Sequence, residues 1–284
     1  MNFKEISNPL TKDLVPLDNQ VKITDEPLPS SGNHSWLIVG KKATGKSSLL
    51  LRSVTSKNSP YCSRKAFDNV FICSQSAHRD DKFSDIVDEL ESFGHYHSTF
   101  NEEILNDILE EIQKFNNQYK EDVMEFQMNK DNEGKGYYTR VVGKTKEGKD
   151  IIRKIYKERL LPRHLIILDD VLNLLPKSTQ NSKINDLYTN HRHFKTSIIT
   201  TSQVYNKLNT TIRRNADMLS LFGTENQTEY DAIKNDWTID KNLFENVWNY
   251  ATREPYSFLH IQVCGVKPLF FKKFNKIVLE PIPQ

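Results

Sequence analysis

The chain has 284 residues and a formal net charge of +2, a length that suits one large α/β domain or a core domain with an elaboration. The near-neutral net charge gives the chain no overall attraction to nucleic acid, so any binding of nucleic acid must come from local clusters of positive charge. Three widely spaced cysteines without C-x-x-C spacing argue against a disulfide framework or zinc knuckle and favour a reducing compartment. The sequence has no apolar run of about 18 residues, and Met1–Ser31 lacks the apolar core of a signal peptide. We therefore predict a soluble protein.

Four prolines disfavour a helix near the start of the chain. We predict an extended arm over residues 1–34 and one large domain over residues 35–284. In this domain short apolar runs alternate with longer amphipathic stretches, which is typical of an α/β fold with a mainly parallel central sheet flanked by helices. The predicted strands are Trp36–Val39, Val70–Cys73, Leu165–Leu168, Thr196–Thr200 and Met218–Phe222.

The stretch between the second and third of these strands is too long for a simple crossover and must hold structure of its own. Residues Phe100–Tyr119 carry apolar side chains at helical spacing, with Asn101 or Thr99 as the cap, and predict a helix. An insertion over about 121–163 contains two β-prone segments around a turn with Gly and Lys, which predicts a β-hairpin of Tyr137–Val142 and Ile151–Tyr156. A polar helical region follows at Asn226–Arg253, and then a terminal strand pair, Phe258–Cys264 and Leu269–Phe274.

A P-loop, or Walker A motif, follows directly after the first predicted strand and precedes an apolar helix. Its glycines let backbone N–H groups wrap a phosphate chain, and the helix N-terminus favours anionic oxygens. We predict that Lys46 reaches the β- and γ-phosphates of ATP and that Ser47 ligates Mg²⁺. The predicted nucleotide-binding residues are Gly40, Lys41, Lys42, Ala43, Thr44, Gly45, Lys46, Ser47 and Ser48.

Two carboxylates end the buried-type strand Leu165–Leu168, as expected of a Walker B element. We predict that Asp169 holds Mg²⁺ through water and that Asp170 polarises the attacking water. By itself such a strand often ends in a surface turn; the upstream P-loop favours the functional interpretation, because the metal needs a carboxylate from a second strand near Ser47. Gln203 follows the next strand at the edge where ligands bind in α/β sheets, which makes it a candidate sensor of the γ-phosphate; the alternative is an ordinary loop glutamine.

Three arginines are candidates for a finger that stabilises the nucleotide of a neighbouring subunit: Arg192, Arg213 and Arg214. For each of them a solvated surface arginine is the alternative. His191 and His193 flank Arg192 without cysteines or paired carboxylates at ligand spacing, so we interpret them as packing or hydrogen-bonding residues.

In order along the chain, these motifs resemble those of the viral genome-packaging ATPases of the FtsK–HerA superfamily, the poxvirus, giant-virus and virophage type. The resemblance rests on the P-loop, on Ile166–Asp170, on Asn190–His193, on Ser197–Gln203 and on Ile212–Asn215. It implies a P-loop NTPase fold and ATP-driven translocation of double-stranded DNA by a ring, hexameric or pentameric. It also implies a viral capsid or portal vertex as partner, and a location in the host cytoplasm or the virion. By position it makes Arg192 the best finger candidate, Gln203 the sensor and Arg213 the arginine of Arg-x-Asn.

The insertion concentrates positive charge, with ten Lys and Arg residues against three acidic ones over residues 135–163. Such a cluster can neutralise backbone phosphates and release counterions, so we hypothesise that the hairpin lines or borders the pore of the ring. A basic exposed ribbon is equally typical of protection against edge pairing.

Three other functions share part of this pattern. A helicase or DNA-partitioning ATPase of the same superfamily would carry every motif above and differ in its partners. A small-molecule kinase would phosphorylate an acceptor independently of DNA. A binding module with a silent P-loop is disfavoured, because Lys46, Ser47, Asp169 and Asp170 are all present.

Overall fold

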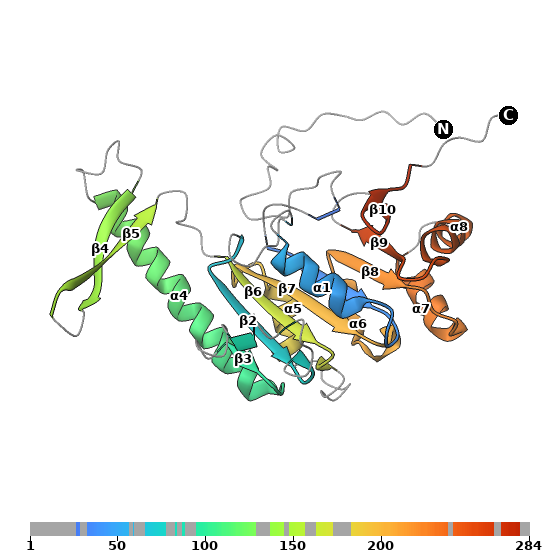
Figure 1. Cartoon of the computed structure of the whole chain (residues 1–284), viewed down its shortest axis with the longest axis horizontal. Coiled ribbons are helices and arrows are strands. Elements are labelled where there is room, and N and C mark those ends of the chain that lie inside the picture. Colours follow the sequence, from blue (N-terminus) through green and yellow to red (C-terminus); the bar gives the residue numbers. More distant parts are fainter. Residues whose placement is uncertain are drawn as a thin grey trace, which may run out of the picture.

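The computed structural model describes residues 27–28, 33–56, 59, 66–77, 83, 87–88, 95–128, 137–144, 148–156, 163–172, 183–237, 241–263 and 268–278. The central strands are β1 (Ser35–Val39), β2 (Asn69–Ser74), β3 (Tyr96–His97), β6 (His164–Asp169), β7 (Thr196–Ser202), β8 (Met218–Phe222), β9 (Phe258–Gln262), β10 (Leu269–Lys272) and β11 (Asn275–Lys276). They form one nine-stranded sheet in the order β11-β10-β9-β8-β1-β7-β6-β2-β3 (Figure 1).

Neighbouring strands are parallel from β8 to β3, and the C-terminal strands β9, β10 and β11 add to β8 in antiparallel pairs. The predicted mainly parallel sheet and C-terminal strand pair are therefore confirmed. The register places the last residues of β1, β7 and β6 beside one another, because Val39 pairs with Ser202 and Asp169 with Thr201. The segments that follow these strands must consequently leave the sheet at the same edge.

Helices cover both faces of the sheet (Figure 1). One face packs against α1 (Lys46–Thr55), and the other against α4 (Glu102–Met128), α5 (Lys183–Asn190), α6 (Thr210–Arg214), α7 (Gln227–Trp237) and α8 (Lys241–Thr252). In β1, Trp36 and Ile38 belong to the first core while Leu37 and Val39 belong to the second. Alternate side chains of a strand point to opposite faces, so a strand buried on both sides is apolar throughout.

The predicted helix over Phe100–Tyr119 is present and longer than expected, since α4 continues to Met128. Asn101 caps it by accepting a hydrogen bond from the Ile104 N–H at 2.8 Å. Residues 120–128 contain no glycine or proline, so nothing breaks the helix there. Its 27 residues span about 40 Å.

The predicted hairpin is confirmed as β4 (Tyr137–Lys144) paired with β5 (Asp150–Tyr156). It stands at the far end of α4, apart from the central sheet (Figure 1). Other features were not predicted, among them the short strands β3 and β11, the helices α5 and α6, and the division of the polar helical region into α7 and α8. Among the residues that the structure describes, no helix has the combined length and apolar character needed to cross a membrane.

The arm predicted over residues 1–34 lies mostly outside the described residues, but Pro27 and Leu28 contact the sheet. The Pro27 carbonyl accepts a hydrogen bond from His260 Nε2–H at 2.7 Å, and Leu28 is buried in the core under α1. Ser220 Oγ accepts from Trp36 Nε1–H at 3.0 Å and donates to His260 Nδ1, 2.9 Å away. This chain of hydrogen bonds fixes His260 as a neutral imidazole.

Because His260 is buried, we predict that the stability of the fold decreases in acid. Burial lowers the pKa of His260 from 6.5 to about 4, and the Pro27 carbonyl offsets this only in part. Between these pH values the unfolded chain binds a proton that the folded chain does not, so stability is full above pH 6.5 and falls as the pH falls towards 4. His164, whose pKa burial also lowers to about 4, acts in the same direction.

We therefore expect the free energy of unfolding of wild type to fall between pH 7 and pH 4.5 by about 2 kcal/mol more than that of His260→Gln. Glutamine does not titrate, yet it can donate to Pro27 and accept from Ser220. Urea unfolding at a series of pH values measures the difference, and parallel pH profiles for the two proteins would contradict the assignment.

Candidate functional site

The predicted P-loop connects β1 to α1 at the carboxyl edge of the sheet, with its entry held close to β7 and β8. The Gly40 N–H donates to the Ser202 carbonyl at 3.1 Å. A side chain at Gly40 would place its Cβ 2.7 Å from Phe222 Cβ, so only glycine fits there. Gly45 has φ of 103°, a left-handed conformation that favours glycine. The sequence pattern thus reflects a backbone that turns tightly just before α1.

The other loop residues keep the turn closed. Ala43 also adopts a left-handed conformation, with φ of 65°, and Thr44 Oγ1 donates to the Lys41 carbonyl at 2.9 Å. Lys41 Nζ forms an ion pair with Glu225 at 3.2 Å, and both Lys41 and Lys42 are exposed.

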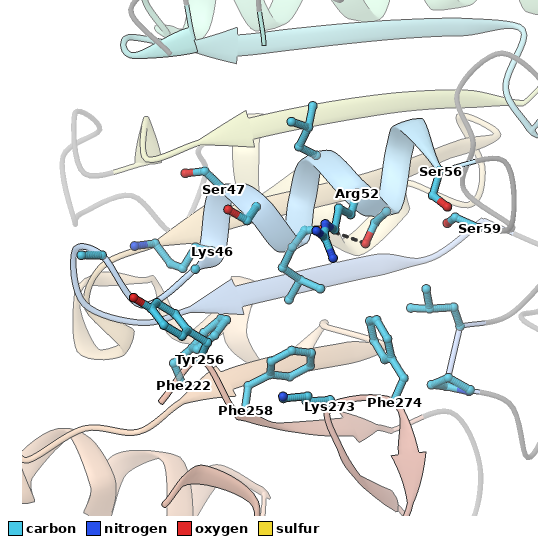
Figure 2. Close-up of a pocket in the computed structure, with 18 residues that line it drawn as sticks. Lys46, Ser47, Arg52, Ser56, Ser59, Phe222, Tyr256, Phe258, Lys273 and Phe274 are labelled. Atoms are coloured by element: carbon cyan, nitrogen blue, oxygen red, sulfur yellow. Dashed lines mark hydrogen bonds between the residues drawn. The ribbon is translucent and has the colours of Figure 1, made fainter. Parts of the chain in front are cut away.

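Lys46 turns back over the loop, and its Nζ donates to the Lys41 carbonyl at 3.1 Å. The residue is only 7% exposed. Burial lowers the pKa of its ammonium group, and the negative charges of Asp170 and Asp169 act to raise it. Ser47 and Ser48 line the same cavity as Lys46, and Figure 2 shows Lys46 and Ser47 side by side at the start of α1. A buried ammonium group therefore lies within the electrostatic reach of both acidic residues.

Asp169 ends β6 with both carboxylate oxygens held by hydroxyl groups of adjacent strands. Ser74 at the end of β2 donates to Oδ2 at 2.8 Å, and Thr201 of β7 donates to Oδ1 at 2.7 Å. The residue as a whole is only 5% exposed. Hydroxyl donors fix its orientation and leave further lone pairs on each oxygen.

Asp170 follows in a left-handed conformation, with φ of 53°. Its N–H donates to Thr201 Oγ1 at 3.0 Å, and its Oδ2 accepts from Gln203 Nε2 at 3.0 Å. Its other oxygen, Oδ1, is buried without a hydrogen-bond partner. Such strain and an unsatisfied acceptor are typical of functional sites.

These residues fit a bound Mg·ATP. The loop offers backbone donors, a helix N-terminus and an ammonium group to phosphate oxygens, and Asp170 Oδ1 lacks a donor of its own. Hydroxyl and carboxylate oxygens, here from Ser47 and Asp169, are the ligands that Mg²⁺ takes. Within the described residues, no group of three or more His, Cys, Asp and Glu side chains forms another metal site.

Arg192, the preferred finger candidate, lies away from this constellation within its own chain. It precedes β7, whereas Gln203 follows it, and the seven residues of the strand separate the two ends by about 20 Å. Its guanidinium pairs with Asp217, and the Arg192 side chain is 41% exposed. Burial raises the pKa of Asp217, but hydrogen bonds and charges from His191, Arg192 and Ser35 outweigh it and lower that pKa overall.

His191 has the packing role that the sequence suggested, since it is buried and its Nδ1–H donates to the Tyr188 carbonyl at 3.0 Å. Arg213 is held between α6 and α7: its guanidinium pairs with Asp236 at 2.6 Å and lies 4.8 Å from the centre of the Tyr205 ring. Arg214 is the more accessible of the two, with 70% of its side chain exposed. None of these arginines approaches the phosphate-binding loop through a hydrogen bond recorded among the described residues.

Sequence reasoning missed the residues that orient the acidic pair. Ser74 and Thr201 both stand at carboxyl ends of parallel strands, and that position was the available signal. It also missed Tyr256, which lies against the loop at Gly45 and lines the cavity (Figure 2). No motif marks this tyrosine, because it comes from a turn before β9, far along the chain.

Comparisons with known proteins show the fold of the chain. No protein-family model and no curated protein matches the sequence. Among solved structures, the genome-packaging NTPase B204 of Sulfolobus turreted icosahedral virus 2 in complex with AMP is similar, with a TM-score of 0.51 and 16% identity over 87% of this chain and 98% of that chain. Its complex with ATP-gammaS gives a TM-score of 0.50 and 16% identity over 85% and 98%. The chain therefore shares the fold of these structures, and the P-loop NTPase fold expected from the sequence is confirmed.

Proposed function

We propose that this chain is an ATPase that couples hydrolysis of Mg·ATP to translocation of double-stranded DNA, packaging a viral genome into a preformed capsid. The observation that carries the proposal is the meeting of Lys46, Asp169, Asp170 and Gln203 at one edge of the sheet. The first two are buried and electrostatically coupled, and the last two are hydrogen-bonded to each other. The fold shared with B204, whose name states genome packaging, supports the choice of DNA as the load.

Each residue has a distinct task in this proposal. The loop amides of Gly40–Ser47 and the Lys46 ammonium bind the phosphate chain. Ser47, and Asp169 through water, would hold Mg²⁺, which neutralises charge on the phosphates. Asp170 Oδ1 accepts a proton from the attacking water, because it is the oxygen without a donor. Gln203 holds the opposite oxygen of Asp170 and so transmits the state of the γ-phosphate to β7.

Assembly into a ring of five or six subunits would complete the site. An arginine finger from a neighbouring subunit supplies positive charge during phosphoryl transfer. Arg192 is our first candidate because of its match to the family motif, and Arg213 is the second. In each case the guanidinium must leave an aspartate of its own chain, Asp217 or Asp236, to act in this way.

The test is ATPase turnover with and without double-stranded DNA, measured alongside the mass of the particle in solution with nucleotide bound. We expect basal hydrolysis that DNA stimulates and a mass of several subunits. Lys46→Ala serves as the control that removes nucleotide binding. If DNA does not change the rate of hydrolysis and the protein stays monomeric, translocation is contradicted and a small-molecule kinase is favoured.

The basic hairpin provides the proposed grip on DNA. Lys149 is exposed beside the turn, and Lys144 pairs with Asp150 in the strand register; Lys146 lies outside the described residues. We expect Lys144→Glu with Lys149→Glu to reduce DNA stimulation by tenfold or more while basal hydrolysis stays within about twofold, since two phosphate contacts are replaced by repulsion. The salt dependence of DNA affinity should also become shallower.

A matched control keeps the same change of charge away from the hairpin. Lys114 and Lys120 are exposed on α4, and Lys114→Glu with Lys120→Glu should leave stimulation nearly unchanged. Equal losses of DNA stimulation in the two double variants would mean that the stimulation depends on net charge alone. The proposed role of the hairpin in DNA binding would then be wrong.

A further inference from the structure

A cavity of about 1250 Å³ opens beside the phosphate-binding loop and runs along α1 (Figure 2). One wall is α1 with the loop, and the opposite wall comes from β8, β9 and the turn after β10. That opposite wall is strongly aromatic, with Phe222, Tyr256, Phe258 and Phe274. Ligand pockets of about 300–1,000 Å³ hold drug-sized molecules, so the cavity has room for a nucleoside beyond the phosphates.

The strand order indicates which way a bound nucleotide points. Asp169 ends β6, and Asp170 and Gln203 directly follow β6 and β7. These two strands lie on one side of β1 in the sheet, whereas β8 and β9 lie on the other. In the proposed function the terminal phosphate faces the acidic pair. The nucleoside end must then extend across the loop towards β8 and β9, where the aromatic wall begins.

Tyr256 is the aromatic residue at the entrance of this wall. Its Cδ1 lies 3.6 Å from the position that a Cβ on Gly45 would occupy, and Phe222 lies just behind, at 3.8 Å from the same point. Figure 2 shows the Tyr256 ring next to the loop. Yet the residue is 70% exposed, an unusual exposure for an aromatic side chain that stands beside a buried site.

The backbone of Tyr256 is held in a strained conformation as well. Its φ is 57°, in the left-handed region where a bulky side chain is a genuine outlier. The neighbouring turn is closed by Ser257 N–H, which donates to the Glu254 carbonyl at 3.1 Å, and it leads directly into β9. Strain of this kind persists where the surrounding structure fixes it, commonly at ligand sites.

We propose that the ring of Tyr256 is the platform on which the base of the bound nucleotide stacks. This inference rests on the proposed function, since it takes the phosphate-binding loop as the site of the triphosphate. Bases stack on aromatic rings without needing a particular hydrogen-bond pattern. The ligand class is therefore a nucleoside triphosphate, and the ring contributes affinity for its base rather than for its phosphates.

The experiment compares Mg·ATP with Mg·tripolyphosphate, which presents the same phosphate chain without a base. Affinities are measured by calorimetry for wild type, Tyr256→Ala, Tyr256→Phe and Tyr256→Asn, the last because asparagine tolerates a left-handed backbone. We expect the Ala and Asn variants to bind ATP about tenfold or more weakly and tripolyphosphate as tightly as wild type. The Phe variant should resemble wild type with both ligands.

Tyr250→Ala is the matched control, because Tyr250 is another exposed tyrosine, 50% exposed on α8, outside the lining of this cavity. It should change neither affinity. Equal weakening of both ligands by Tyr256→Asn would overturn the proposal in favour of a role in shaping the loop, and unchanged ATP affinity would overturn it outright. A wild-type protein that binds neither ligand would instead defeat the proposed ATPase function, and the stacking platform with it.

Discussion

Asp170→Asn is expected to lower the maximal rate of ATP hydrolysis by about 10²–10⁴-fold, the usual contribution of a positioned general base, while the affinity for Mg·ATP stays within a few fold. The reason lies in the two oxygens of Asp170. Oδ2 is committed to Gln203 at 3.0 Å, and Oδ1 is buried without a partner. An amide in this place can still fill the space but cannot accept a proton from water. Steady-state turnover and separate equilibrium binding of ATP measure the two quantities.

Gln203→Ala is the graded companion of this variant. It removes the hydrogen bond that orients Asp170 and leaves the carboxylate itself, so we expect a smaller loss of turnover than with Asp170→Asn. If both variants bound ATP normally and Asp170→Asn retained more than a tenth of wild-type turnover, Asp170 would not be the base. That outcome would not affect the role of Asp169, whose carboxylate is oriented separately by the hydroxyl groups of Ser74 and Thr201.

The site was predictable where it depends on a local sequence motif or on the alignment of the carboxyl ends of parallel strands. The P-loop follows from glycine spacing, and Gly40 and Gly45 prove to be positions where a side chain clashes or the backbone is left-handed. Asp169 and Gln203 were placed together because carboxyl ends of parallel strands meet at one edge. The register of β6 on β7 does bring these ends together, and a hydrogen bond links Gln203 to Asp170.

What the sequence could not predict depends on contacts between distant segments. Tyr256 reaches the loop only because β9 adds to β8 in an antiparallel pair that aligns Phe258 with Phe222. By contrast, the extension of α4 beyond Tyr119 was missed although the sequence signals it, since Val123 and Phe126 continue the helical spacing of the apolar residues and no glycine or proline intervenes. Arg192 carries a family motif but no signal for its partner, because Asp217 lies 25 residues away in sequence.

That partner yields the second large effect: Asp217→Ala should lower the free energy of unfolding by about 3 kcal/mol, because a buried acceptor is removed and the donors that it satisfies lose their hydrogen bonds. Asp217 Oδ2 accepts from the Ser35 N–H at 2.8 Å, and Oδ1 accepts from Arg192. The Asp217 side chain is only 9% exposed. Its loss leaves a buried amide at the start of β1 and a guanidinium without their acceptor, both at the edge opposite the nucleotide.

Chemical denaturation at pH 7 measures this loss, with Asp231→Ala as an exposed aspartate control that should stay within about 0.5 kcal/mol of wild type. Asp217→Asn should fall between the two, because an amide oxygen can still accept from Ser35. A double-mutant cycle with Arg192→Ala then isolates the coupling between Arg192 and Asp217. That coupling is the free energy that Arg192 must give up before it can serve a neighbouring nucleotide. A coupling near zero would leave Arg192 free to act as a finger, whereas a large one would count against Arg192 in that role.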